Sequence, residues 1–168
     1  MMSRRQISGF TLVELMVVVT VVAILAAVAF PNFQALIRSN RVATASNEML
    51  ASLSLARTEG IRGTRGAGLC PSANGTSCGG AWNAGWIVWQ EVNGDGAMTA
   101  GTDRVVRYSQ GKPHMTVTNA QNAIVYDSRG RIVGGGQSFS VVPDGYTADA
   151  RSVCIGATGQ ARVAYGSC

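Results

Sequence analysis

Glu14 is the residue whose chemistry is hardest to reconcile with its surroundings. It lies within an apolar stretch, GFTLVELMVVVTVVAILAAVAFPNF, that runs from Gly9 to Phe33. A carboxylate inside such a stretch costs roughly 2.5–3.5 kcal/mol on membrane-insertion scales. A buried carboxylate and an ammonium offset each other's desolvation only when they pair. Glu14 therefore indicates a cationic partner in the same apolar environment.

The apolar stretch is long enough to cross a membrane. Phe10 to Phe30 is 21 residues, which makes about 31 Å of helix at ~1.5 Å per residue. This length matches the ~30 Å hydrocarbon core of a bilayer. Arg4 and Arg5 precede the stretch and place the N-terminus in the cytoplasm by the positive-inside rule. We expect a transmembrane helix over residues 10–36, bent at Pro31 because proline removes a backbone hydrogen bond and clashes with the preceding turn.

The stretch as a whole resembles the N-terminus of a type IV prepilin. The resemblance is carried by Gly9-Phe10-Thr11-Leu12-Val13-Glu14, the apolar run and Pro31. It implies that residues 1–9 are a leader, which prepilin peptidase removes between Gly9 and Phe10 before the Phe10 amine is methylated. It also implies that Glu14 meets the Phe10 amine of a neighbouring pilin subunit, which sets the assembly register.

Other interpretations of the same stretch are open. A secretory signal peptide could be cut after Ala27-Val28-Ala29, but its apolar region would hold a glutamate and exceed the usual ~7–15 residues. A single-span anchor with Glu14 reaching the membrane interface would leave a periplasmic protein that joins no filament.

Four cysteines, Cys70, Cys78, Cys154 and Cys168, all follow the apolar stretch. They would lie in the periplasm, where disulfides form. Three pairings are possible, and we favour Cys70–Cys78 with Cys154–Cys168 because each closes a local loop. Such loops contribute roughly 2–3 kcal/mol each. The absence of a Cys-x-x-Cys pair disfavours redox catalysis and a zinc site.

Beyond the membrane segment the sequence predicts a continuing helix and then a β-rich head. Val42, Ala45, Met49 and Leu53 follow the three-and-four spacing of an amphipathic helix over residues 37–61 that packs on a sheet. Gly60 and Gly63 would end this helix. The periplasmic head, 62–168, has short β-like runs separated by turn residues. The expected strands are one near Leu69 and then 86–90, 104–108, 115–118, 123–126, 131–133, 138–142, 152–155 and 160–164. The expected fold is α+β and pilin-like: a long N-terminal helix packed on an antiparallel sheet.

The head is similar to the GspH/FimT group of minor pilins and H-type pseudopilins. The resemblance is carried by CPSANGTSC, GWIVW, NGDG, DSRGRI and VCIGATGQARV with a final cysteine. It implies a non-enzymatic minor subunit that acts in type IV pilus assembly or at the pilus tip, or in type II protein secretion. The arginine-rich C-terminal part and the CPSANGTSC loop favour the pilus.

Some members of this group bind DNA through a C-terminal Gly-Arg-x-Arg motif. The matching residues here are Gly159, Gln160, Ala161 and Arg162, so one arginine is lost. Arg129 and Arg131 form a second pair two residues apart, and residues so spaced on a strand face the same way. The formal charge is +5, and +3 without Arg4 and Arg5, which is compatible with polyanion binding. The alternative is that these arginines are solvated surface residues.

No residue pattern indicates an enzyme, a cofactor or a metal site. Glu91 to Gly96, with Asp103, resembles half of a calcium loop, but Thr102 stands where the closing glutamate belongs, so we favour an Asn-Gly and Asp-Gly hairpin loop. His114 is the only histidine and has no ligand or catalytic partner at suitable spacing. Trp82, Trp86 and Trp89 are expected in the core.

Overall fold

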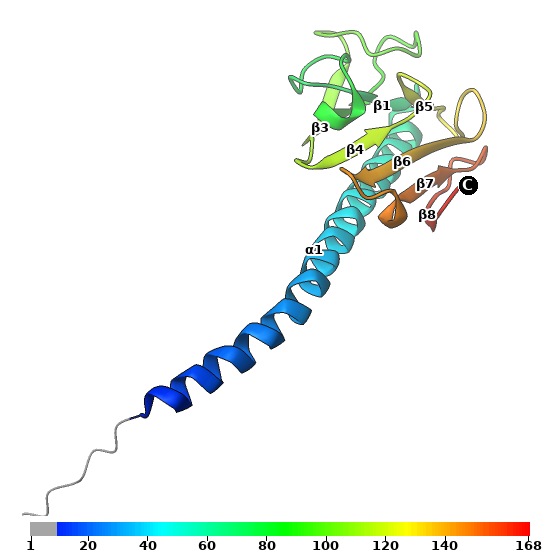
Figure 1. Cartoon of the computed structure of the whole chain (residues 1–168). Helices are drawn as coiled ribbons and strands as arrows, with labels where there is room; N and C mark the ends of the chain where they lie inside the picture. Colours follow the sequence, from blue (N-terminus) through cyan, green and yellow to red (C-terminus); the bar gives the residue numbers. More distant parts are fainter. Residues whose placement is uncertain (1–9) are drawn as a thin grey trace, which may run out of the picture. The chain divides into compact units, whose positions relative to one another are not determined.

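The computed structural model describes residues 10–168, so residues 1–9, which we expect to be the leader, lie outside the described residues. The chain divides into two compact units, one ending at Ile37 and the other spanning Arg38–Cys168. A single helix, α1 (Leu12–Gly63), contributes to both (Figure 1). It stays helical through Pro31, and the bend at Pro31 remains a prediction.

The head contains two antiparallel sheets where the sequence analysis expected one. Sheet 1 has the order β3-β2-β1-β5, and sheet 2 has the order β4-β6-β7-β8. The strands are β1 (Ala67–Pro71), β2 (Gly85–Gln90), β3 (Arg104–Gln110), β4 (Met115–Thr118), β5 (Ile124–Tyr126), β6 (Gln137–Pro143), β7 (Arg151–Ile155) and β8 (Ala161–Tyr165). Two short 3-10 helices, η1 (Trp82–Ala84) and η2 (Thr147–Asp149), complete the head.

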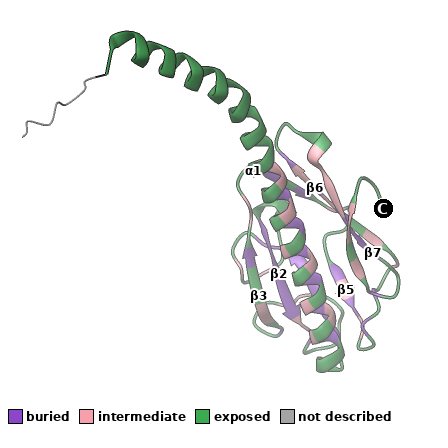
Figure 2. Cartoon of the chain, turned by 90° about the horizontal axis from the view of Figure 1, so that it is seen from below, coloured by how far each residue is buried: buried purple, intermediate pink, exposed green. Residues whose placement is uncertain are grey.

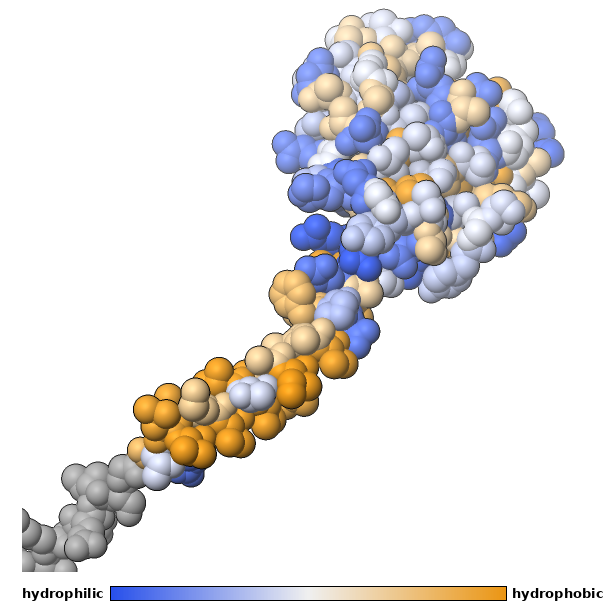
Figure 3. Space-filling model, in the orientation of Figure 1, coloured by the Kyte–Doolittle hydropathy of each residue, from blue (hydrophilic) through white to orange (hydrophobic). Residues whose placement is uncertain are grey.

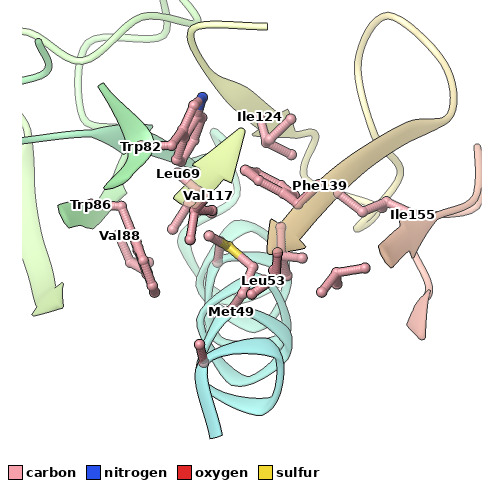
Figure 4. Packing of buried hydrophobic residues seen from close by; sticks show 14 of the residues in the cluster. Met49, Leu53, Leu69, Trp82, Trp86, Val88, Val117, Ile124, Phe139 and Ile155 are labelled. Carbon is pink, nitrogen blue, oxygen red and sulfur yellow. The ribbon is translucent and has the colours of Figure 1, made fainter. Parts of the chain in front are cut away.

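One stripe of α1 holds the two sheets together. Val42, Ala45, Met49 and Leu53 are each at most 2% exposed, and they recur at the spacing that places residues on one helix face. Buried side chains of both sheets meet this stripe, among them Val88 of β2 and Phe139 of β6 (Figure 4). Figure 2 shows the buried residues of α1 on the side that faces the strands. The core is therefore one cluster shared by the helix and both sheets.

Sheet 1 is buried on its other face as well. There Cys70, Ile87 and Trp89 form a second cluster, against which Met98 from the loop after β2 packs. The Trp89 ring occupies the space where a side chain at Gly68 would lie. The tryptophans are in the core as expected, and the Trp86 indole donates a hydrogen bond to Ser52 Oγ at 3.0 Å.

Residues 131–133, where the sequence predicted a strand, do not form one. Ile132 makes only an isolated bridge to Tyr126. The reason is the tight turn just before it, in which Asp127 Oδ1 accepts the backbone N–H groups of Arg129 and Arg131. Positive-φ glycines at 134 and 135 then turn the chain again, so too few extended residues remain for a ladder.

The helix α1 continues past Gly60, one of the two glycines that were expected to end it. Gly60 lies inside the helix and is buried. A Cβ there would lie 3.2 Å from the Asp127 carbonyl oxygen, which is tighter than side chains normally pack. Gly60 thus permits close approach of α1 to the end of β5, and α1 ends at Gly63.

Replacing Leu53 with alanine tests the shared core. Leu53 is fully buried in the cluster that joins α1 to both sheets, so Leu53→Ala should lower the free energy of unfolding by about 2–5 kcal/mol. Urea unfolding of the detergent-solubilised chain, followed by circular dichroism, measures this loss. The neighbouring exposed residue gives a control, because Ser54→Ala should change stability by less than about 0.5 kcal/mol. Equal effects of the two substitutions would contradict the packing described here.

Candidate functional site

The N-terminal part of α1 exposes apolar side chains on every side. All residues from Phe10 to Leu36 are exposed, and the segment appears as a continuous apolar surface in Figure 3. Among the described residues, α1 is the one helix long and apolar enough to cross a membrane. A helix that is apolar all round requires a membrane or a protein interior. Residues up to Ile37 are therefore built to be surrounded by lipid or by other apolar helices.

Glu14 lies in the first turn of this helix. Its backbone N–H donates to Thr11 Oγ1 at 3.2 Å, so Thr11 caps the helix that begins at Leu12. Thr11-x-x-Glu14 is the spacing of a capping box, in which the acid also faces the positive end of the helix dipole. The sequence analysis missed this feature, although the Thr-x-x-Glu spacing was the signal. Within residues 10–168, Glu14 forms no ion pair.

Both disulfides of the head are present. Cys70 pairs with Cys78, and Cys154 pairs with Cys168. The first ties the loop after β1 to sheet 1, and the second ties the C-terminal residues to β7. Each bond therefore links a surface segment to a buried strand cysteine.

Two turns that lie far apart in the sequence come together beside α1. A Cβ on Gly159, in the β7–β8 turn, would collide with the carbonyl oxygen of Gly130. Arg57 of α1 connects both turns, because its Nε donates to the Gly130 carbonyl at 2.9 Å and its Nη2 to the Thr158 carbonyl at 3.3 Å. Gly159 thus has a packing role that its place in a binding motif does not explain.

This contact brings the two candidate arginine elements of the sequence onto neighbouring turns. We call Arg129, Arg131, Gln160 and Arg162 the paired-turn surface. All four are exposed, and within residues 10–168 none of the three arginines forms an ion pair. Asp127 is the nearby carboxylate, and its Oδ1 already accepts two backbone N–H groups. The surface therefore carries a net positive charge.

Gln160 and Arg162 also line one groove, of about 930 Å³, over sheet 2. Arg162 stands opposite Cys154 in the β7–β8 ladder, and Ser138 stands opposite Cys154 in the β6–β7 ladder. The groove lining has hydroxyl and amide side chains and one cation, with no carboxylate side chain among the described lining residues. This arrangement suits hydrogen bonds to an anionic or polar ligand.

The loop from Glu91 to Asp103 gathers three carboxylates. Oxygens of Glu91, Asp95 and Asp103 lie within 4.8 Å of one another. However, both oxygens of Glu91 accept backbone N–H groups, from Gly94 and Gly96, each at 3.0 Å. Both oxygens of Asp103 likewise accept backbone N–H groups, from Val92 and Thr99.

The carboxylates of this loop thus organise its backbone. The pKa of the exposed Asp95 is lowered chiefly by a hydrogen bond from the Ala97 N–H, which again is a local backbone contact. His114 is exposed, with a φ of 60°. It belongs neither to the Glu91–Asp103 loop nor to the paired-turn surface.

Comparisons with known proteins follow the same division between helix and head. Residues 4–30 match the family model described as the prokaryotic N-terminal methylation motif. Residues 45–159 match the model described as type II transport protein GspH. No curated protein sequence matches the chain.

Solved structures of two minor subunits share the fold. The type IV minor pilin FimU of Pseudomonas aeruginosa is 18% identical with a TM-score of 0.58, and the match covers 72% of this chain and 90% of FimU. The minor pseudopilin EpsH of the Vibrio cholerae type 2 secretion system is 14% identical with a TM-score of 0.54, covering 74% of this chain and 96% of EpsH. The expected pilin-like α+β fold is confirmed.

Tyr126 provides a pH test of the packing at the paired turns. Burial raises the pKa of its phenol to about 12, and the nearby Arg57 charge opposes part of that rise. Because the neutral phenol is favoured in the fold, its stabilising contribution is complete below about pH 10, the unfolded pKa, and is lost between pH 10 and 12. The whole loss amounts to about 2–3 kcal/mol.

Tyr126→Phe should therefore reduce the fall in unfolding free energy between pH 9 and pH 12, as measured by chemical denaturation. At neutral pH the variant should be at least as stable, because the buried Tyr126 hydroxyl has no hydrogen-bond partner among the described residues. Tyr165→Phe, at an exposed ring, should keep the full alkaline loss. A Tyr126→Phe profile identical to that of the parent would refute the assignment.

Proposed function

Because this chain belongs to the GspH family of type II transport proteins, we propose how such a minor pseudopilin enters its filament. It is a structural, non-enzymatic subunit of a type II secretion or type IV pilus-like system, anchored in the inner membrane with a periplasmic head. The proposal is that a cleaved Phe10 amine and Glu14 form a charge pair between neighbouring subunits. That pair fixes the axial position of each subunit.

The observation that supports this is an apolar helix surface with one carboxylate. When a subunit leaves the bilayer, its exposed apolar surface must be covered by other apolar helices, and Glu14 then enters a medium of low dielectric constant. An unpaired charge there is strongly unfavourable, whereas a paired one is tolerated. Cleavage after Gly9 would create the required cation at Phe10. Only a register that joins the two charges avoids an unpaired carboxylate.

The proposed partners are prepilin peptidase, which would cut between Gly9 and Phe10, and other pilins or pseudopilins, which would supply the neighbouring helices. The methylation motif over residues 4–30 supports processing. Apolar contacts along Phe10–Phe30 would supply most of the association energy, and Glu14 would supply its specificity. Pro31 would adjust the direction of the helix between filament core and head.

Substitutions at Glu14 separate charge pairing from helix capping. Glu14→Ala should be cleaved and methylated normally but fail to enter filaments, because its neighbour's amine loses its partner. Glu14→Gln should fail in the same way if charge is required, since glutamine preserves a capping box but carries no charge. N-terminal mass spectrometry measures processing, and immunoblotting of sheared filaments measures incorporation.

Thr20→Ala is the matched control for the same segment. Thr20 is exposed on the apolar helix, and its hydroxyl donates only to the Met16 carbonyl of its own helix. This variant should enter filaments normally. If Glu14→Gln enters filaments and Glu14→Ala does not, the role of Glu14 is helix capping. Normal incorporation of Glu14→Ala would refute the register role.

A second candidate function is DNA binding in DNA uptake, at the paired-turn surface. The observation that favours it is the Gly130–Gly159 contact, which sets Arg129 and Arg131 beside the turn that leads to Arg162. Exposed arginines without carboxylate partners are available for phosphates, and Gln160 can add a hydrogen bond without releasing a counterion. Because Gln160 replaces the first arginine of the motif, we expect weaker DNA binding than the full motif would give, and an affinity that depends less on salt concentration.

Gel-shift titration of the full chain in detergent, at two salt concentrations, tests DNA binding. Arg162→Ala should weaken binding and reduce the slope of log affinity against log salt by about 0.7–0.9. Arg104→Ala, at an exposed arginine of β3 in sheet 1, is the matched control and should leave affinity unchanged. Absence of binding at low salt, or equal effects of the two substitutions, would rule out this role.

A further inference from the structure

We propose that the end of the head at which the chain enters it, at Arg38, rests on the periplasmic surface of the bilayer through a collar of tyrosines and arginines. The collar consists of Arg38, Arg41, Tyr146, Arg151 and Tyr165. Its proposed partner is the phospholipid headgroup layer. This contact concerns the head and is independent of the Glu14 charge pair and of the paired-turn surface.

Arg38 fixes one half of the collar. Its guanidinium carbon lies 3.9 Å from the centre of the Tyr146 ring, and its Nε lies 3.6 Å from Asp149 Oδ2. These contacts fasten η2 and the turn before it to the start of the head portion of α1. Tyr146 nevertheless stays 47% exposed, because the arginine covers only one face of its ring.

Arg151 and Tyr165 form the other half. Arg151 begins β7 and pairs with Tyr165 at the end of β8, and its guanidinium carbon lies 4.8 Å from the Tyr165 ring centre. Arg151 follows Asp149 by two residues, so this pair lies close to the Arg38 contacts. In Figure 1, η2 and the end of β8 lie at the same end of the head.

Tyr165 remains highly exposed although the Arg151 guanidinium lies over its ring. It is 81% exposed, whereas Tyr126 is fully buried and Tyr108 is 37% exposed. Tyrosine is enriched where an apolar medium meets water, because its ring and hydroxyl suit the two sides of a membrane interface. Arginines beside such rings can reach lipid phosphates while their stems cover apolar surface.

Chain continuity places the collar close to the headgroup layer. A hydrocarbon core spanned by Phe10–Phe30 leaves eight residues, or about 12 Å of helix, before Arg38. One headgroup layer is roughly 5–7 Å thick. Arg38 and the residues that contact it would therefore emerge a few ångströms beyond that layer, where long side chains can reach back to the phosphates.

The charges of the collar favour a lipid surface over a strongly acidic protein. A groove of about 310 Å³ beside Tyr146 is lined by Arg38, Arg41 and His114, but also by Asp144. Asp149 adds a second carboxylate. Such mixed charge matches a headgroup layer in which phosphates and amines alternate, whereas an acidic partner would meet repulsion from both aspartates.

Quenching by brominated lipid tests the proposal on the full-length chain in nanodiscs. The three native tryptophans are at most 5% exposed, so they give a constant background. Tyr165→Trp and, separately, Tyr146→Trp add one probe each at an exposed position. In phosphatidylethanolamine–phosphatidylglycerol nanodiscs brominated near the headgroup end of the acyl chains, we expect the added emission to be quenched relative to unbrominated nanodiscs.

Val133→Trp is the matched control at the far end of the head. Val133 is 60% exposed and follows the turn of Gly130, which lies against Ile61 of α1. Ile61 is about 35 Å along the helix from Arg38, so this probe should escape quenching. Absence of quenching at both tyrosine positions, or equal quenching at Val133, would overturn the proposal. Emission that changes only when other pilins or pseudopilins are added would assign the collar to a subunit contact instead.

Discussion

A single helix has to satisfy two environments, and the rest of the structure depends on that constraint. Up to Ile37 its apolar side chains face outward in all directions, which suits lipid or the apolar interior of a filament. From Val42 onward only one stripe is apolar, and that stripe is buried by two sheets. The same secondary structure therefore serves as a membrane anchor and as the central element of the head's core.

The two-sheet head follows from the need to cover that stripe. One four-stranded sheet presents a single apolar face, whereas the buried residues of α1 meet side chains from both sheets, including Val88 and Phe139. Small residues then set how closely the parts approach: Gly60 lets α1 reach the end of β5, and Gly68 makes room for the Trp89 ring. Outside this core, Glu91 organises the loop after β2, Asp127 organises the turn that carries Arg129 and Arg131, and two disulfides restrain a loop and the C-terminal residues.

Several features could be predicted from the sequence because they rest on local chemistry. The apolar run and Glu14 identify the anchor, the three-and-four spacing of Val42, Ala45, Met49 and Leu53 identifies the buried stripe, and alternation between turn residues locates most strands. The prediction of a strand at 131–133 was wrong, because the hydrogen bonds of Asp127 and the conformations of two glycines outweighed β propensity. The second sheet could not be foreseen, since strand order depends on contacts between residues far apart in sequence.

By itself, the sequence determined the kind of protein this is: the apolar helix and the β head follow from composition and periodicity, and the motifs at Gly9–Glu14 and in the head carry the resemblance to pilin-like subunits. The tertiary structure decided which surface residues become neighbours. Gly159 and Gly130 meet, and Arg38 and Arg151 each stack on a tyrosine near η2. The physical reason is that local propensity acts over a few residues, whereas these surfaces arise only when α1 and two sheets bury a common core.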